Sequence, residues 1–226
     1  MDSLIVSLLP FIIGGVVEPI QIIVVALLLT GEKQGPLKAI AFVLGMTLAR
    51  LAQGILFQLT ITGGSGDPAD ASVSLHWIKS TLLLVLGLLL LITAYKKWIK
   101  EPDPDAPPPK WLAMLDGSTP ARALLLGAGF ILIAVKLWVF TLGALSVIDG
   151  AQLEQRETLI VFLGYILLAQ SLLIILILFR LILPVRAGRW LGSFSRWLEK
   201  YNNQIVMIAS LVFGLLFLYQ GITGLF

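Results

Sequence analysis

The sequence predicts an all-α membrane protein with six transmembrane helices. Its 226 residues are 58% hydrophobic and only 13% charged, a balance that soluble domains of this size seldom reach. The apolar residues also fall into six blocks, each long enough to cross a hydrocarbon core of ~30 Å as a helix of roughly 20 residues. Blocks such as Leu82–Leu91 are apolar on every face and do not alternate, which favours helices over the strands of a barrel.

The distribution of basic residues predicts the topology. The expected spans are Leu4–Thr30, Leu37–Ile61, Leu75–Ile99, Ala121–Ile148, Leu159–Leu183 and Ile205–Gly224. The connections after spans one, three and five contain twelve of the 16 lysines and arginines, whereas the two opposite connections contain only Lys79 and Arg156. Because basic loops stay in the cytoplasm, we expect both termini on the non-cytoplasmic side of a bacterial-type inner (plasma) membrane.

A proline-rich stretch divides the chain into two blocks of three spans. Residues 1–99 form the first block, 100–120 a cytoplasmic linker and 121–226 the second block. Three spans per block place the halves in opposite orientations, so we expect two inverted three-helix repeats; the alternative is an ordinary loop between unrelated hairpins. A short match between the halves supports a repeat: Phe42-Val-Leu-Gly45 in span two resembles Val161-Phe-Leu-Gly164 in span five. Residues 186–199 are expected to form an amphipathic helix at the membrane interface.

Three ionisable residues lie deep in the expected spans, Glu18, Arg50 and Lys136. Each costs at least ~2.5–3.5 kcal/mol near the bilayer centre, so a partner or a water-filled cavity is expected. Their summed charge of +1 favours anions or zwitterions over bare divalent cations, which want several oxygen ligands. With no cysteine and a single histidine, His76, no metal site and no cofactor are expected.

Glu18 precedes Pro19 near the middle of span one, with Gly14 and Gly15 one turn before. Proline removes a helical hydrogen bond and disfavours helical geometry in the preceding residue. We therefore expect the first helix to be broken at Glu18-Pro19, with exposed backbone groups of the kind that transporters use as binding sites. Gln21 adds a polar group there. The alternative is a packed proline kink with Glu18 buried and protonated.

The other candidate residues have two interpretations each. Lys136 can balance Glu18 across the repeat interface or bind an anionic substrate. Arg50, with Gln53 one turn away, is a second candidate anion contact, or pairs structurally with Glu18. Gln170 in span five is a weaker candidate, because hydrogen bonding between helices explains it adequately.

The pattern Leu8-Leu-Pro10, Glu18-Pro-Ile-Gln21 and Ala41-Phe-Val-Leu-Gly45 resembles the GAP (glycolipid-addressing, or Sap) family of the lysine-exporter (LysE-type) superfamily. The resemblance implies a six-helix exporter with paired three-helix repeats, in a branch linked to moving glycolipids or their precursors. Where that family usually has an Asn-Pro-Lys-like motif, this chain has Ala134-Val135-Lys136. Since the asparagine and proline are missing, the sequence does not predict a second helix break there.

The leading hypothesis is an export-type transporter or translocase for an anionic, zwitterionic or amphiphilic substrate, with membrane lipids as surroundings and a small molecule or lipid as cargo. An accessory subunit of a lipid or envelope assembly system is the alternative. An enzyme is not expected, because the spans contain no paired catalytic groups. No nucleic-acid partner is expected, and the glycine-rich spans can pack within one monomer or in a homodimer.

Overall fold

The computed structural model describes residues 2–31, 34–62, 68–99 and 119–224, and all secondary structure in these ranges is helical. The helices are α1 (Asp2–Val16), α2 (Pro19–Thr30), α3 (Gly35–Thr62), α4 (Pro68–Ile99), α6 (Pro120–Ile133), α7 (Val135–Gly150), α8 (Gln155–Ala169), α9 (Ser171–Ile182) and α10 (Pro184–Thr223). Most of the predicted linker, 100–120, lies outside the described residues.

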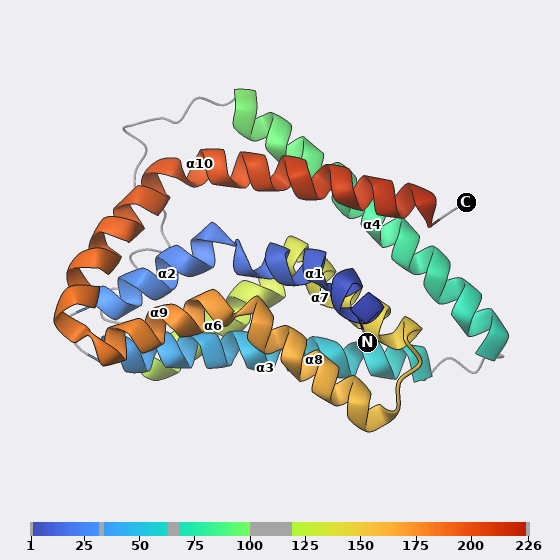
Figure 1. Ribbon diagram of the computed structural model, residues 1–226, viewed down its shortest axis with the longest axis horizontal. Helices are drawn as coiled ribbons and strands as arrows, with labels where there is room; N and C mark the ends of the chain where they lie inside the picture. The colour runs from blue at the N-terminus through green and yellow to red at the C-terminus, as the bar shows by residue number, and fades with distance from the viewer. Residues whose placement is uncertain (1, 32–33, 63–67, 100–118, 225–226) are drawn as a thin grey trace.

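The helices run roughly along one long direction, so the molecule has two ends (Figure 1). At the end that we call the terminal end, α1 begins and α10 finishes. At the opposite end, the linker end, α2 finishes, α6 begins and α9 meets α10. Figure 1 shows α4 and α10 crossing on one side of the molecule, with α1 and α7 in the middle and α3, α8 and α9 on the far side. The α4–α10 pair therefore faces α1 and α7 along one seam.

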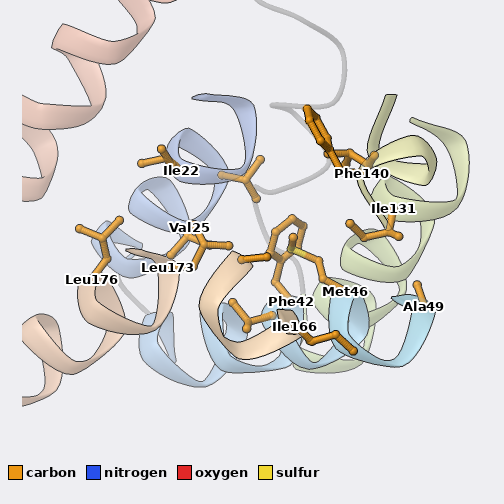
Figure 2. Close-up of a cluster of buried hydrophobic side chains, with 14 of the residues drawn as sticks. Ile22, Val25, Phe42, Met46, Ala49, Ile131, Phe140, Ile166, Leu173 and Leu176 are labelled. Carbon is orange, nitrogen blue, oxygen red and sulfur yellow. The ribbon is translucent and has the colours of Figure 1, made fainter. Parts of the chain in front are cut away.

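The buried core lies between the middle and far helices. Figure 2 shows side chains from α2, α3, α6, α7, α8 and α9 meeting there, among them Val25, Phe42, Met46, Ile131 and Ile166. The outward faces carry large exposed apolar side chains, for example Ile55, Leu125 and Ile175. An apolar outer surface around a packed core is what a protein surrounded by lipid requires.

Two helix pairs pack backbone to backbone through glycine. At the α3–α6 contact, a Cβ at Gly45 would collide with the carbonyl oxygen of Leu124, and one at Gly127 with that of Phe42. At the α4–α10 contact, a Cβ at Gly87 would lie 2.8 Å from the Leu218 amide nitrogen. Small residues allow such close approach and are typical of helix pairs in membranes.

The predicted break in the first span is confirmed: α1 and α2 meet at a 51° bend at Glu18-Pro19. Two further bent pairs were not predicted, α6–α7 at 73° and α8–α9 at 60°. Within the described residues, α3 and the Lys200–Thr223 part of α10 are single helices apolar and long enough to cross a membrane, and counting each bent pair as one span gives up to five. The chain is therefore an all-helical membrane protein, while the six-span inverted repeat stays a prediction.

The unpredicted break at α6–α7 has a physical explanation without proline. Ala134 leaves the helical region with φ −79° and ψ 92°. The break frees carbonyl groups that a continuous helix would satisfy, and the indole Nε1 of Trp138 donates to the carbonyl oxygen of Leu132 at 2.9 Å. A side chain from the following helix thus replaces a lost backbone hydrogen bond, as buried backbone groups in a membrane require.

The segment predicted as an amphipathic interface helix forms the first part of α10, at the linker end, and Figure 1 shows it bending away from the spanning part. Exposed Trp190 stacks on Phe194 with ring centroids 4.7 Å apart, and Trp197 and Tyr201 continue the row. Ala187, Leu191 and Leu198 are buried on its other face. Arg180 fixes this corner by donating from Nε to the Leu29 carbonyl oxygen at 3.1 Å.

Candidate functional site

Two of the helix breaks lie against each other in the middle of the molecule. A Cβ at Gly15, just before the α1–α2 break, would lie 3.0 Å from the Cβ of Ala169, the last residue of α8. Gln170 separates α8 from α9 with φ −107° and ψ 4°. Helix ends with incomplete backbone hydrogen bonding therefore converge here, which is how binding sites are built at mid-membrane depth.

A group of buried and partly buried polar side chains surrounds the α8–α9 break, and we call it the Arg50 cluster. Its members are Thr47 and Arg50 of α3, Thr141 of α7, and Tyr165 and Gln170 at the end of α8. The Thr47 hydroxyl donates to Oε1 of Gln170 at 3.1 Å. Arg50 interacts electrostatically with Tyr165, whose hydroxyl lies beside Thr141. Three spans thus each contribute polar groups to one buried location.

The guanidinium of Arg50 is the largest charged group in this interior. Arg50 is only 1% exposed, yet its Nε and one terminal nitrogen have no hydrogen-bond partner among the described residues. The amide of Gln53, 0% exposed, lacks partners at both its nitrogen and its oxygen, and the Gln170 amide nitrogen also lacks one. Each such group costs about 1–3 kcal/mol when nothing bonds to it. The protein therefore maintains a set of buried donors that its own described side chains do not satisfy.

The electrostatic partner of the Arg50 guanidinium is equally informative. In the described part of the chain, the electrostatic interaction of Arg50 is with Tyr165 and not with a carboxylate. A buried cation normally pairs with an anion, because an unpaired charge in a low-dielectric interior is strongly destabilising. An anionic group of a bound molecule would supply the missing charge and accept the free N–H groups.

Glu18 occupies the N-cap position of α2 with an extended backbone, φ −86° and ψ 103°, and is 4% exposed. It lines a small cavity of about 30 Å³ together with Pro19, Phe140, Leu90 and Ser210. This cavity lies on the seam towards α4 and α10 and includes neither Arg50 nor Gln53. Glu18 and Arg50 therefore line different parts of the interior.

The remaining predicted residues are placed less directly. Gln21 is buried on α2, and its amide nitrogen has no partner among the described residues. Lys136 is the second residue of α7, directly after the break at Ala134, and its side chain falls outside the described residues. Ala134 and Val135 hold the N-cap and first helical positions that Glu18 and Pro19 hold at the break of the first span, and Lys136 follows directly after them.

Sequence reasoning missed Tyr165, Thr47 and Thr141. Tyr165 carried a usable signal, because tyrosine in membrane proteins gathers at the two interfaces and this one stands in the middle of a span. The two threonines carried none, since a threonine hydroxyl commonly bonds the preceding turn of its own helix, as both do here.

Comparison with known proteins gives one match. No curated protein and no solved structure matches this chain. A family model does match, and it covers residues 8–223, nearly the whole chain and every residue of the site described above. The protein accordingly belongs to the family described as Sap, sulfolipid-1-addressing protein.

Proposed function

We propose that this protein is an export-type transporter or translocase that moves an anionic or zwitterionic amphiphile, such as a lipid-linked molecule, across the bacterial inner membrane. The proposal is carried by two buried guanidinium nitrogens of Arg50, Nε and Nη1, which have no hydrogen-bond partner among the described residues. The family description adds a link to lipid addressing.

The chemistry of the Arg50 cluster fits the polar head of such a molecule. Arg50 supplies positive charge, while Gln53, Gln170 and Tyr165 supply neutral donors and acceptors. Charge-assisted hydrogen bonds to an anion are roughly twice as strong as neutral ones, and they strengthen further where water is excluded. The apolar outer faces of the helices leave the hydrocarbon part of the substrate in contact with lipid-like surroundings.

The proposal assigns roles to the other two deep charges. Glu18 is the coupling group at the first helix break, and Lys136 is a second attraction for negative charge at the break of span four. With both termini outside the cytoplasm, the basic linker end faces inward and collects anionic substrate. A place in the LysE-type superfamily, with inverted repeats, belongs to the same proposal. We expect Lys136→Ala to abolish transport and leave the protein folded.

The decisive experiment replaces Arg50 by Met, an apolar side chain of similar length. In proteoliposomes with a fluorescent anionic phospholipid, we expect at least a tenfold loss of flux. Arg50→Lys should lose less flux because it keeps the positive charge. Arg156→Gln, a substitution of an exposed residue near the terminal end, should lose no flux. Wild-type flux in Arg50→Met would remove the role of the guanidinium.

Thermal unfolding of the same variants, without substrate, separates a binding role from a structural one. Replacing an unsatisfied buried charge by a packed apolar side chain is often neutral or stabilising by ~1–4 kcal/mol. We therefore expect Arg50→Met to unfold at the same temperature or higher. A loss of ~3–5 kcal/mol, the usual consequence of breaking a buried ion pair, would show that Arg50 belongs to a structural pair.

The accessory-subunit alternative makes a different prediction in the same assay. No compound would move when the protein is alone, for wild type and all variants alike, and movement would appear only when a partner is present. Stoichiometric co-purification with an envelope assembly enzyme would then identify that partner.

A further inference from the structure

Two cavities lie on the same seam, between the α4–α10 pair and helices α1 and α7. The first is the cavity of about 30 Å³ at Glu18, called the Glu18 cavity here. The second, the terminal-end cavity, measures about 230 Å³ and is lined by Ser7, Ser80, Gln220 and Thr223 among others. The polar residues of its lining that the structure describes are uncharged, and it lies at the terminal end.

Each of the four helices contributes to both cavities in the same order. On α10, Ser210 and Phe213 line the Glu18 cavity, whereas Gln220 and Thr223 line the terminal-end cavity. On α1 the order is Gly14 and then Ser7, on α4 Leu90 and then Ser80, and on α7 Phe140 and then Val147. The two cavities are therefore successive positions along one seam, and the residues that line them are about two to three helical turns apart on each helix.

Four phenylalanine rings fill the separation, and we call them the phenylalanine gate: Phe11, Phe140, Phe213 and Phe217. Phe217, fully buried, lies 5.6 Å from Phe11, 5.8 Å from Phe140 and 6.0 Å from Phe213 between ring centroids. Phe11 also lines the terminal-end cavity, and Phe140 and Phe213 line the Glu18 cavity. The four rings thus lie between the two cavities and separate them.

The gate is made of parts that can move. Phe140 packs on Gly14, and Phe11 packs on Gly143, so each ring rests on a bare stretch of helix backbone across the α1–α7 contact. A ring in such a position changes place by rotating about two side-chain bonds, whereas a helix-on-helix backbone contact changes only by moving a helix.

We propose that the seam is the passage by which the substrate leaves the Glu18 region towards the terminal end, and that the phenylalanine gate closes it in the present structure. The apolar rings and Leu90 form a wall suited to the hydrocarbon part of an amphiphile, and the terminal-end cavity receives its uncharged polar part. The identity of the cargo rests on the proposed function; the existence of the passage does not.

The chain contains no cysteine, so a single introduced thiol is a specific reporter. Ser210→Cys places it in the Glu18 cavity, where Ser210 is buried, and Thr223→Cys places one at the exposed rim of the terminal-end cavity. With a charged, membrane-impermeant methanethiosulfonate reagent, we expect Thr223→Cys to react quickly and Ser210→Cys at least tenfold more slowly, because the gate excludes the reagent.

Removing the central ring should then open the passage. In the Ser210→Cys background, Phe217→Ala is expected to raise the labelling rate at least tenfold, and Phe217→Leu to raise it less. The matched control is Phe42→Ala, which removes a ring of equal burial from the α3–α6 core, away from the seam, and should leave the rate unchanged.

Two results would overturn the passage. The first is that folded Phe217→Ala and Phe217→Leu label Ser210→Cys at the same rate as the protein with the gate intact. The second is that Ser210→Cys reacts as fast as Thr223→Cys when the gate is intact. Lipid flux is measured separately on the same proteins. An opened Ser210 site without lipid movement supports the passage and counts against the proposed cargo. If both gate variants move lipid while Ser210→Cys still labels slowly, the result supports the proposed cargo and counts against the passage.

Discussion

The α3–α6 contact and the α1–α7 contact both depend on glycines, but the glycines face different atoms. Gly45 and Gly127 lie against main-chain atoms of the opposite helix, Leu124 and Phe42. Gly14 and Gly143 lie against the aromatic rings of Phe140 and Phe11. In the first contact, neither side can move without displacing a helix. In the second contact, the aromatic ring can move by side-chain rotation alone, without displacement of a helix.

This difference divides the molecule into a fixed part and an adjustable part. The α3–α6 contact positions Arg50 and Gln53 on a helix whose partner approaches backbone to backbone. The α1–α7 contact borders the seam with its two cavities and its four rings. The proposed transport function needs both, because a binding residue must be held in place while a passage opens and closes. The largest effects on stability are therefore expected at α3–α6 and the largest effects on access at α1–α7.

Gly127→Ala should be the most destabilising change in this series. Its Cβ would collide with the Phe42 carbonyl, so the two helices must separate and lose contacts along their length. Overpacking of this kind typically costs ~1–3 kcal/mol, and we expect the upper part of that range because the obstacle is backbone. Thermal unfolding in detergent measures it.

Gly129→Ala is the control for that change, two residues away on the same helix, where an added Cβ meets nothing within 4 Å. It should be neutral or slightly stabilising. Equal destabilisation by both substitutions would mean that α6 is sensitive to any alanine, and the contrast between the two contacts would lose its basis.

Part of this architecture was predictable from the sequence. The break at Glu18-Pro19 followed from the restrictions that proline places on its own and the preceding residue. Glu18 and Arg50 were expected deep in the spans because they lie within apolar blocks, and both side chains are buried in the structure. These inferences needed only local sequence.

The other breaks depend on contacts that no local pattern reveals. At the bend after Ile133, Nε1 of Trp138 donates to the carbonyl oxygen of Leu132, and nothing in Ala134-Val135 predicts that contact. Gln170 departs from helical geometry where Thr47, more than a hundred residues earlier, bonds its side chain. The separation of Glu18 and Arg50 into different parts of the interior likewise depends on how six helical segments rotate about their axes, which sequence spacing leaves open.

Gly14→Ala should have an intermediate effect on stability and a larger one on access. The added methyl group displaces the Phe140 ring, and we expect a loss of ~1–2 kcal/mol together with faster labelling of Ser210→Cys. A smaller side chain at position 140 should relieve the collision, so Gly14→Ala with Phe140→Leu should be less destabilised than the sum of the single changes. If the losses of stability from the two single changes simply add, the collision with the Phe140 ring is not the cause of the destabilisation by Gly14→Ala.

Gly164→Ala should have the smallest effect, and it tests the symmetry of the two halves. Gly164 ends the motif in span five that matches the one ending at Gly45 in span two. Gly45 faces the Leu124 backbone, whereas a Cβ at Gly164 meets nothing within 4 Å. Measured side by side by thermal unfolding, Gly45→Ala should be strongly destabilised and Gly164→Ala neutral or stabilised by up to ~1 kcal/mol. Comparable losses of stability would mean that the matching glycines have the same packing role in both halves. Unequal losses mean that the two matching motifs serve different packing: the motif in span two forms a backbone-to-backbone helix contact at its glycine, and the motif in span five does not.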